Sequence, residues 1–97
     1  MIALIAKMKI KKGKAENVIA LFRELVPKVR EEAGTLAYSI CRDNNNPDML
    51  VIVERYKDMA ALQAHGATPH FKEFSKTLGQ YLDGKPELSI LEEVLSI

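Results

Sequence analysis

The sequence predicts one α+β domain over residues 1–97, with the ferredoxin-like order β-α-β-β-α-β and both helices on one face of an antiparallel sheet. Four segments carry apolar residues in the patterns of strands, and two segments between them repeat apolar residues about every 3.6 positions. No repeat, linker or low-complexity segment interrupts the 97 residues. These observations together predict a single domain.

The first strand is predicted at residues 1–10, MIALIAKMKI. Its alternation places five apolar residues on one face, namely Ile2, Leu4, Ala6, Met8 and Ile10. The other face carries Ala3 and Ile5 before it turns to lysines. A strand with this pattern has one fully apolar face and one partly apolar face.

The first helix is predicted between residues 18 and 33, followed by Gly34 as the residue that ends it. The apolar positions have helical spacing: Val18, Phe22, Leu25, Val29 and Ala33. Pro27 lies inside this pattern, where it removes one backbone hydrogen bond. Because the periodicity continues on both sides, we expect a kinked helix that does not end at the proline.

The second and third strands are predicted at residues 36–42 and 49–57, joined as a hairpin by a long loop over DNNNPD, residues 43–48. In the second strand Tyr38 and Ile40 share a face, opposite to Ser39 and Cys41. The third strand begins with five consecutive apolar residues, which is typical of a strand covered on both faces.

The second helical region is predicted in two parts, and a last strand follows at residues 86–97. Asp58 is expected to cap a helix that runs to residue 64 or 65, and Gly66 to interrupt it. Thr68 followed by Pro69 has the order of a cap and a first helical residue, so a new helix is expected there. Phe71, Phe74 and Leu78 then form its apolar stripe.

Both helices of this fold cover the same face of the sheet, so the other face is bare. The third strand is apolar on both faces, and Ala3 and Ile5 also point outward from the first strand. The chain has no residues left to cover them. We therefore expect a homodimer in which two sheets pack face to face.

Composition and charge exclude several kinds of partner. Lys and Arg total 14 against 13 Asp and Glu, spread without blocks, so no surface is built for a phosphate backbone or an anionic membrane. No apolar stretch is long enough to span a bilayer, and lysines interrupt residues 1–10 where a signal peptide would be apolar. We expect a cytoplasmic protein that binds neither nucleic acid nor membrane.

A metal site is not expected. Cys41 is the only cysteine, so it has neither a disulfide partner nor a second thiolate, and it is expected to be a buried structural thiol. His65 and His70 are five residues apart with Gly66 and Pro69 between them, whereas a zinc pair on a helix needs a spacing of four. The acidic residues nearby show no ligand spacing.

The histidine pair favours proton transfer over metal binding. A neutral imidazole can accept a proton from a mildly acidic hydroxyl near neutral pH. His65 and His70 flank a helix break, where a cavity can form, and four aromatic residues could line it: Tyr38, Tyr56, Phe71 and Phe74. Two simpler readings stay open, because a histidine can merely bind helix-end carbonyls and an aromatic stripe can merely be core.

Two stretches of the chain resemble a known family. REEAGTLAYSI, residues 30–40, and VIVERYKDMAALQAHGATPHFKEF, residues 51–74, are similar to the antibiotic biosynthesis monooxygenase (ABM) domain family, in particular its small quinol monooxygenase-like members. In that family a Glu, any residue and an aromatic close the third strand, and a His followed by T-P-H-F or similar occupies the helix break. The matching residues here are Glu54, Tyr56, His65, Thr68, Pro69, His70 and Phe71.

The resemblance covers essentially the whole chain and implies a dimeric α+β barrel with one pocket per subunit. It implies oxidation of small phenols or quinols by O2 without metal, flavin or haem, because an electron-rich phenolate can itself reduce O2. It makes His65 the base or hydrogen-bond partner of the substrate, and Tyr56 the second catalytic residue, which orients substrate together with Glu54. The further substrate-binding residues it implies are Tyr38, His70, Phe71 and Phe74.

The sequence departs from the family in ways that bear on the substrate. Tyr56 replaces the commoner Trp, which leaves the pocket shape and the substrate open. Haem-degrading relatives carry an Asn on strand one, a Trp on the second helical segment and a His beyond it. Here strand one has no Asn, His65 stands near the Trp position and Ser75 near the expected His, so haem breakdown is disfavoured.

Two other functions stay open. Similar proteins with this fold isomerise or degrade small phosphorylated signal molecules, which requires cations in the pocket, and Arg42, Arg55 and Lys72 are the candidates. The chain could also be a non-catalytic dimeric module for small-molecule binding or stress response, because a fold alone does not determine function.

Overall fold

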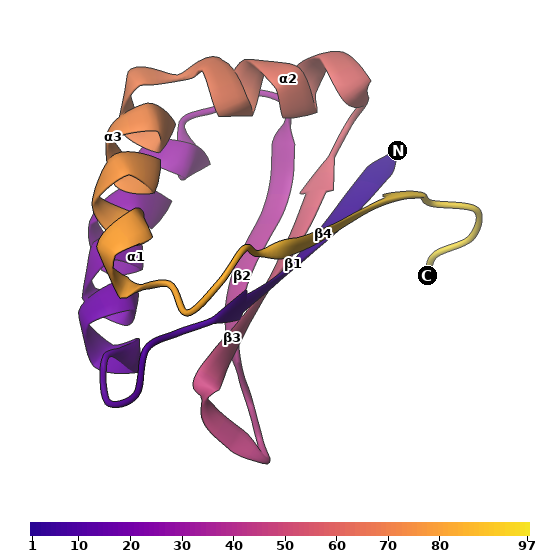
Figure 1. Cartoon of the computed structure of the whole chain (residues 1–97). Helices are drawn as coiled ribbons and strands as arrows, with labels where there is room; N and C mark the ends of the chain where they lie inside the picture. Colours follow the sequence, from indigo (N-terminus) through magenta and orange to yellow (C-terminus); the bar gives the residue numbers. More distant parts are fainter.

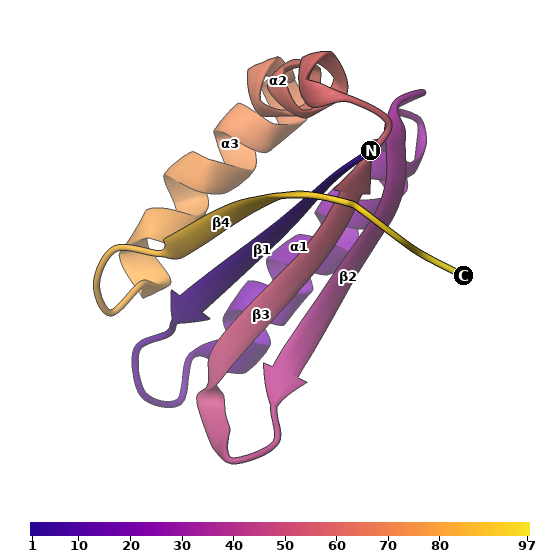
Figure 2. The same cartoon turned by 90° about the vertical axis from the view of Figure 1, so that its right-hand side faces the viewer.

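The computed structural model describes all residues, 1–97, and confirms the ferredoxin-like α+β fold. Its elements are β1 (Ile2–Lys9), α1 (Ala15–Arg30), β2 (Thr35–Asp43), β3 (Asn46–Tyr56), α2 (Met59–Ala67), α3 (Pro69–Leu78), the short 3₁₀ helix η1 (Gly79–Tyr81) and β4 (Glu87–Glu92). The strands form one antiparallel sheet in the order β2-β3-β1-β4. All helices lie on one side of this sheet, and the other side is bare (Figures 1 and 2).

The core lies between the sheet and the helices. Strand β1 buries Leu4, Ala6 and Met8 on the helix side, as its alternation predicts. Four of the five residues predicted for the apolar face of α1 are buried, namely Val18, Phe22, Leu25 and Val29, whereas Ala33 lies beyond the helix and is exposed. Strand register determines which face Glu54 occupies. Leu4 of β1 pairs with Glu54 of β3, so the Glu54 carboxyl lies on the same helix-facing side as Leu4.

The end of α1 differs from the prediction. The helix passes through Pro27, as expected, but it ends at Arg30 with Glu31 as its C-cap. Gly34 does not have positive φ, so it is not the expected left-handed terminator. It is needed for a different reason: a Cβ at this position would collide with the side chain of Ala61 in α2. Gly34 therefore allows α2 to approach the chain that leaves α1.

The connection between β2 and β3 is shorter than predicted. Only Asn44 and Asn45 form the turn, and β3 already begins at Asn46, so the expectation of a long loop over residues 43–48 is wrong. The Asp43 carboxylate accepts a hydrogen bond from the Asn45 amide (2.7 Å), which stabilises a tight turn. A register shift next to Asp43 accommodates the extra residues of β3.

The break between α2 and α3 falls at Thr68, as predicted. Asp58 caps α2 through the Ala61 amide (2.8 Å), and Thr68 caps α3 through the Phe71 amide (3.2 Å), with Pro69 as the first residue of α3. The expectation that Gly66 ends α2 is wrong, because Gly66 is helical and lacks positive φ. Pro69 alone forces its predecessor out of the helix, and Thr68 is extended (ψ 147°).

The bare face of the sheet carries exposed apolar side chains. Val53 is 38% exposed there, and Leu91 is 44% exposed. Cys41 is also exposed, so the expectation of a buried thiol is wrong for the isolated chain. Strand β4 ends at Glu92, which is shorter than the predicted 86–97, and Val94 and Leu95 beyond it are almost fully exposed. None of the helices is long and apolar enough to cross a membrane.

Candidate functional site

A cavity of about 410 Å³ lies between the helices and the β1 side of the sheet. Most of its wall is apolar and comes from β1, α2, α3, β4 and the segment that leads into β4: Leu4, Ala6, Met8, Leu62, Phe71, Phe74, Leu78, Leu82 and Leu88. Five side chains with polar groups interrupt this wall, namely Tyr38, Glu54, His65, Ser75 and Lys85. A cavity of this size with few polar groups is typical of a small-molecule site.

His65 is the best placed of the two histidines to act on a ligand. It lies near the end of α2, is 3% exposed, and lines the cavity. Its ring packs against those of Tyr38, Tyr56 and Phe71, with centroids 5.4, 5.6 and 4.7 Å away. Its Nδ1 lies 2.8 Å from Glu32 Oε1, while its Nε2 is buried without any hydrogen-bond partner.

Glu32 holds both histidines through one carboxyl group. It follows Glu31, the C-cap of α1, and accepts a hydrogen bond from the Thr35 hydroxyl at Oε1 (2.8 Å). Oε1 also contacts His65 Nδ1, and Oε2 lies 2.6 Å from His70 Nε2. Burial alone would raise the pKa of Glu32, but the hydrogen bonds from His70, Thr35 and His65 outweigh it, and the pKa is lowered. The group is therefore a carboxylate at neutral pH.

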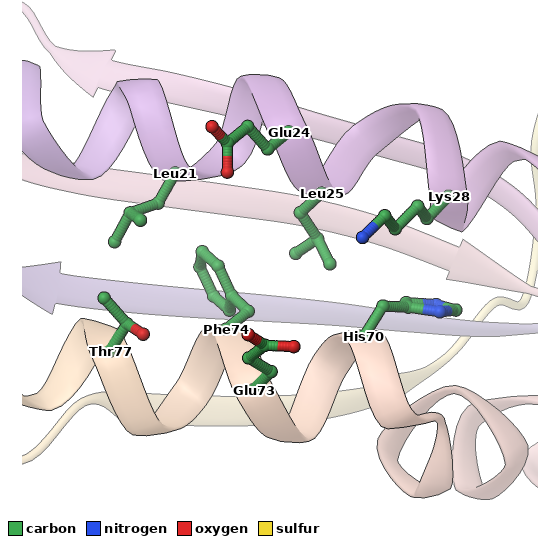
Figure 3. Close-up of a pocket in the computed structure, with 8 residues that line it drawn as sticks. All are labelled: Leu21, Glu24, Leu25, Lys28, His70, Glu73, Phe74 and Thr77. Atoms are coloured by element: carbon green, nitrogen blue, oxygen red, sulfur yellow. The ribbon is translucent and has the colours of Figure 1, made fainter.

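His70 reaches the same carboxylate from a different helix. It is in the first turn of α3 and lines a shallow groove between α1 and α3, outside the cavity (Figure 3). In that groove Leu21 and Leu25 of α1 face Phe74 of α3. His70 therefore supports Glu32 from the outer side of the helix layer. No three His, Cys, Asp or Glu side chains are grouped in a way that could hold a metal ion.

Glu54 is a buried carboxyl group whose ionisation is strongly perturbed. It is 6% exposed, and burial raises its pKa to about 7 even though the Tyr56 hydroxyl donates a short hydrogen bond to it. Burial and the nearby Glu54 raise the pKa of Tyr56, and burial likewise raises that of Tyr38. Both phenols therefore stay protonated at neutral pH, and they act in the site as neutral hydrogen-bonding groups.

The contact with Glu32 determines which tautomer a neutral His65 ring adopts. With a carboxylate at Nδ1, the neutral imidazole carries its proton on Nδ1, because that proton then donates to Glu32. The lone pair is consequently on Nε2, the atom that lacks a partner. A buried acceptor in an apolar cavity can bind and remove the proton of a ligand hydroxyl.

The structure brings together five of the seven predicted site residues. Tyr38, Glu54, His65, Phe71 and Phe74 all line the cavity. The other two do not line it: Tyr56 is fully buried behind Glu54, and His70 faces the outer groove.

Sequence reasoning missed Glu32 and Lys85. Glu32 follows the C-terminus of α1, where the helix dipole disfavours a carboxylate, but Glu31 has the same position and no side-chain partner, so this signal does not single out Glu32. Lys85 follows Gly84 in a turn, and nothing in its spacing marks it as part of a cavity.

The cations proposed for a phosphorylated ligand are elsewhere. Arg42 pairs with Glu16 (2.7 Å), and Arg55 pairs with Glu93 (2.9 Å). Neither of these arginines lines the cavity, and Lys72 does not line it either. The structure therefore gives no support to phosphate binding by these three residues.

The structure thus combines a ferredoxin-like domain, an apolar cavity between helices and sheet, and an imidazole oriented by a carboxylate. The chain belongs to the antibiotic biosynthesis monooxygenase family, whose model matches residues 1–77. It is 30% identical over 88 residues to the "Probable quinol monooxygenase YgiN" of Escherichia coli, a match that covers 80% of this chain and 85% of that protein. It is also 30% identical over 89 residues to the "Uncharacterized protein sll1783" of Synechocystis sp., and this match covers 92% of the chain but only 60% of that longer protein.

Solved structures agree with this family. A crystal structure titled as an antibiotic biosynthesis monooxygenase superposes with a TM-score of 0.90 at 33% identity, covering 98% of this chain and 100% of the other. The protein PA3566 of Pseudomonas aeruginosa gives a TM-score of 0.87 at 31% identity, with 97% and 94% of the two chains covered. The fold and the length of the domain are thus shared with these proteins.

Proposed function

We propose that this protein oxidises small phenols or quinols with O2, with His65 as the base that removes the hydroxyl proton. One observation carries the proposal: His65 Nε2 is buried in the wall of an apolar cavity without a partner, while Nδ1 is held by Glu32. Leaving a buried acceptor unpaired costs free energy, on the order of 1–3 kcal/mol. A ligand hydroxyl bound at Nε2 would remove that cost.

The reaction needs no outside reductant. Transfer of the phenol proton to His65 Nε2 leaves a phenolate, which is electron-rich enough to reduce O2 in a site without water. A ring carbon ortho or para to the oxygen then loses its C–H bond and becomes a carbonyl. One oxygen atom of O2 enters that carbonyl and the other leaves as water, so all four electrons come from the phenol. The proposed reaction uses no metal, flavin or haem.

Glu54 and Tyr56 have supporting roles in this proposal. Because the pKa of Glu54 is raised to about 7, a large share of the carboxyl is protonated near neutral pH and can donate a hydrogen bond to a ligand oxygen. Tyr56 contacts Glu54 from behind and does not line the cavity. It is therefore a positioning residue in this proposal, and Tyr38, Phe71 and Phe74 contact the ring of the substrate.

Oxygen consumption tests the proposal directly. Purified protein treated with a chelator should consume one O2 for each 1-naphthol converted to a naphthoquinone, as followed by an oxygen electrode and by quinone absorbance. His65→Ala should lower the rate about a hundredfold, the usual size of a general-base contribution. Retention of the circular dichroism spectrum would show that the variant folds. A variant that turns over normally, or a rate that disappears with the chelator, would contradict the proposal.

We propose that the active form is a homodimer. The exposed outer sheet face, which contains Val53 and Leu91, and the extended end of the chain, with Val94 and Leu95, support it. A monomer of 97 residues rarely leaves so much apolar surface in water. Covering this face with a second copy would bury on the order of 2,000 Å² in total, which is the size of obligate interfaces.

A further inference from the structure

Lys85 is the only Lys or Arg that lines the cavity, and no carboxylate pairs with it. Its neighbours Asp83 and Glu87 are exposed and form no ion pair with it. The rest of the wall around it is apolar, including Leu82, Pro86 and Leu88. A cation at the edge of an apolar cavity attracts a ligand that carries a negative charge.

Backbone geometry determines the main-chain position of Lys85, whose side chain is exposed at the cavity edge. Gly84 has a φ of 105°, a conformation that other residues rarely adopt, and the Asp83 amide donates to the Lys9 carbonyl (2.8 Å). The turn that presents Lys85 is thus bound to the last residue of β1. Glu54 pairs with Leu4, five residues earlier on that strand, which corresponds to roughly 16 Å of strand length. Lys85 and Glu54 therefore occupy opposite ends of the cavity.

The two ends differ in the charge they accept. The end opposite to Lys85 contains Glu54, Tyr38 and His65. These side chains offer a carboxyl, a phenol and an imidazole to a neutral hydroxyl of the ligand. A second negative charge there would be repelled by Glu54 whenever that group is ionised, and it would be buried without a cation. Lys85 is the only Lys or Arg of the cavity with which an anionic group can pair. The different charges at the two ends of the cavity thus determine the orientation in which an anionic ligand binds.

We propose that the substrate is a hydroxyl-bearing aromatic acid, whose hydroxyl binds at His65 and whose carboxylate, at the far end of the ring system, binds Lys85. This inference rests on the proposed function, because it takes the His65 cavity as the substrate site. The ligand must have its two groups well separated. Fused two-ring compounds with substituents on opposite rings meet this condition.

Binding without turnover tests the inference. Under anaerobic conditions, calorimetry should show that 6-hydroxy-2-naphthoate binds more tightly than its methyl ester, which has the same rings but no charge. The difference should be about fivefold, the size expected for an ion pair at the edge of a cavity. The isomer 3-hydroxy-2-naphthoate should bind more weakly than the 6-hydroxy compound, because its carboxylate is adjacent to the hydroxyl and would lie at Glu54.

Substitution at Lys85 assigns the effect to this residue. Lys85→Gln should remove the preference for the acid over the ester, and Lys85→Glu should reverse it. Lys76→Gln, an exposed position of α3 outside the cavity, is the matched control and should leave the preference unchanged. Equal binding of acid and ester to the parent, or a Lys85→Gln variant that keeps the preference, would overturn the inference. Failure of both the acid and the ester to bind to the parent would also overturn the inference.

The outcomes separate this inference from the proposed function. If acid and ester bind equally well and both are oxidised in air, the inference on Lys85 fails and the monooxygenase proposal stands. If the acid binds in a Lys85-dependent way but neither compound consumes O2, the monooxygenase proposal fails and the site still recognises an aromatic acid.

Discussion

Glu32 Oε1 lies 2.8 Å from His65 Nδ1, although the two residues are 33 positions apart in the chain. The contact joins the end of α1 to the last turn of α2 and fixes which nitrogen of His65 carries the proton. Glu32 also binds His70, so two imidazoles that come from different helices share one carboxylate. His65 and His70 stand on either side of the break at Thr68, and from there both reach the one carboxylate.

In the proposed reaction, replacing Glu32 by Gln should lower turnover by at least about tenfold with the fold intact, because the group that orients a histidine base contributes strongly to the rate. The carboxylate can accept from both imidazoles, whereas an amide offers one acceptor and one donor. At least one histidine must then change its tautomer. Nitrogen NMR of the imidazoles should show this change directly.

Glu31→Gln is the matched control for Glu32. Glu31 is adjacent in sequence, is exposed, and makes no side-chain hydrogen bond. This variant should keep both the tautomers and the rate of the parent. If Glu32→Gln were as active as Glu31→Gln, Glu32 would have only a structural role.

The buried carboxyl of Glu54 should make stability depend on pH. Its pKa is raised from 4.5 to about 7, so the folded state retains a proton that the unfolded state has lost between these values. Stability from this group is therefore fully present below pH 4.5 and is lost as the pH rises to about 7. The loss corresponds to roughly 3 kcal/mol.

Urea unfolding of Glu54→Gln at pH 5 and pH 8 measures this effect. Gln cannot ionise, so the free energy of unfolding of the variant relative to the parent should rise between the two pH values. Glu87→Gln, on the exposed β4, should show no such rise. A constant difference between parent and Glu54→Gln would mean that Glu54 ionises as easily when folded as when unfolded.

Two glycines should respond to alanine in opposite directions. Gly34→Ala inserts a methyl group against Ala61, so it should lower the free energy of unfolding by about 1–3 kcal/mol. Gly66→Ala meets no atom within 4 Å and lies in a helix, so it should raise that free energy by about 0.5–1 kcal/mol. Chemical denaturation measures both, and equal effects of the two substitutions would contradict the contact between Gly34 and α2.

The proposed dimer predicts a mass of twice 10.9 kDa by light scattering at micromolar concentration. Val53→Glu places a charge on the bare sheet face and should give a monomer. Lys76→Glu, on the opposite side of the molecule, should leave the dimer intact. A monomeric parent would overturn the proposal.

Short-range patterns predicted most of the fold. Alternation in residues 1–10 gave the buried face of β1, and the Thr68-Pro69 pair located the break between α2 and α3. These succeeded because strand period, capping and proline geometry act within a few residues. The glycines were less predictable: Gly34 is required by Ala61, a residue 27 positions away, and Gly66 is simply helical.

The candidate site was only partly accessible from sequence. His65 could be placed because it lies beside the helix break that Thr68 and Pro69 mark, and Glu54 because it falls in residues 51–74, which resemble the family. Glu32 could not, since its role depends on how α1 and α2 approach each other in space. Lys85 depends on the path of the chain into β4, which no local pattern specifies. Local sequence patterns therefore place some of the site residues, and contacts between segments far apart in the chain place the others.

The break at Thr68 has a consequence for how the chain can vary in length. Surface connections usually accept insertions and deletions because little depends on their geometry. Here one residue more or less between His65 and His70 would turn α3 by about 100° relative to α2 and carry one imidazole away from Glu32. This connection should therefore tolerate substitutions such as Gly66→Ala far better than any change in the number of its residues.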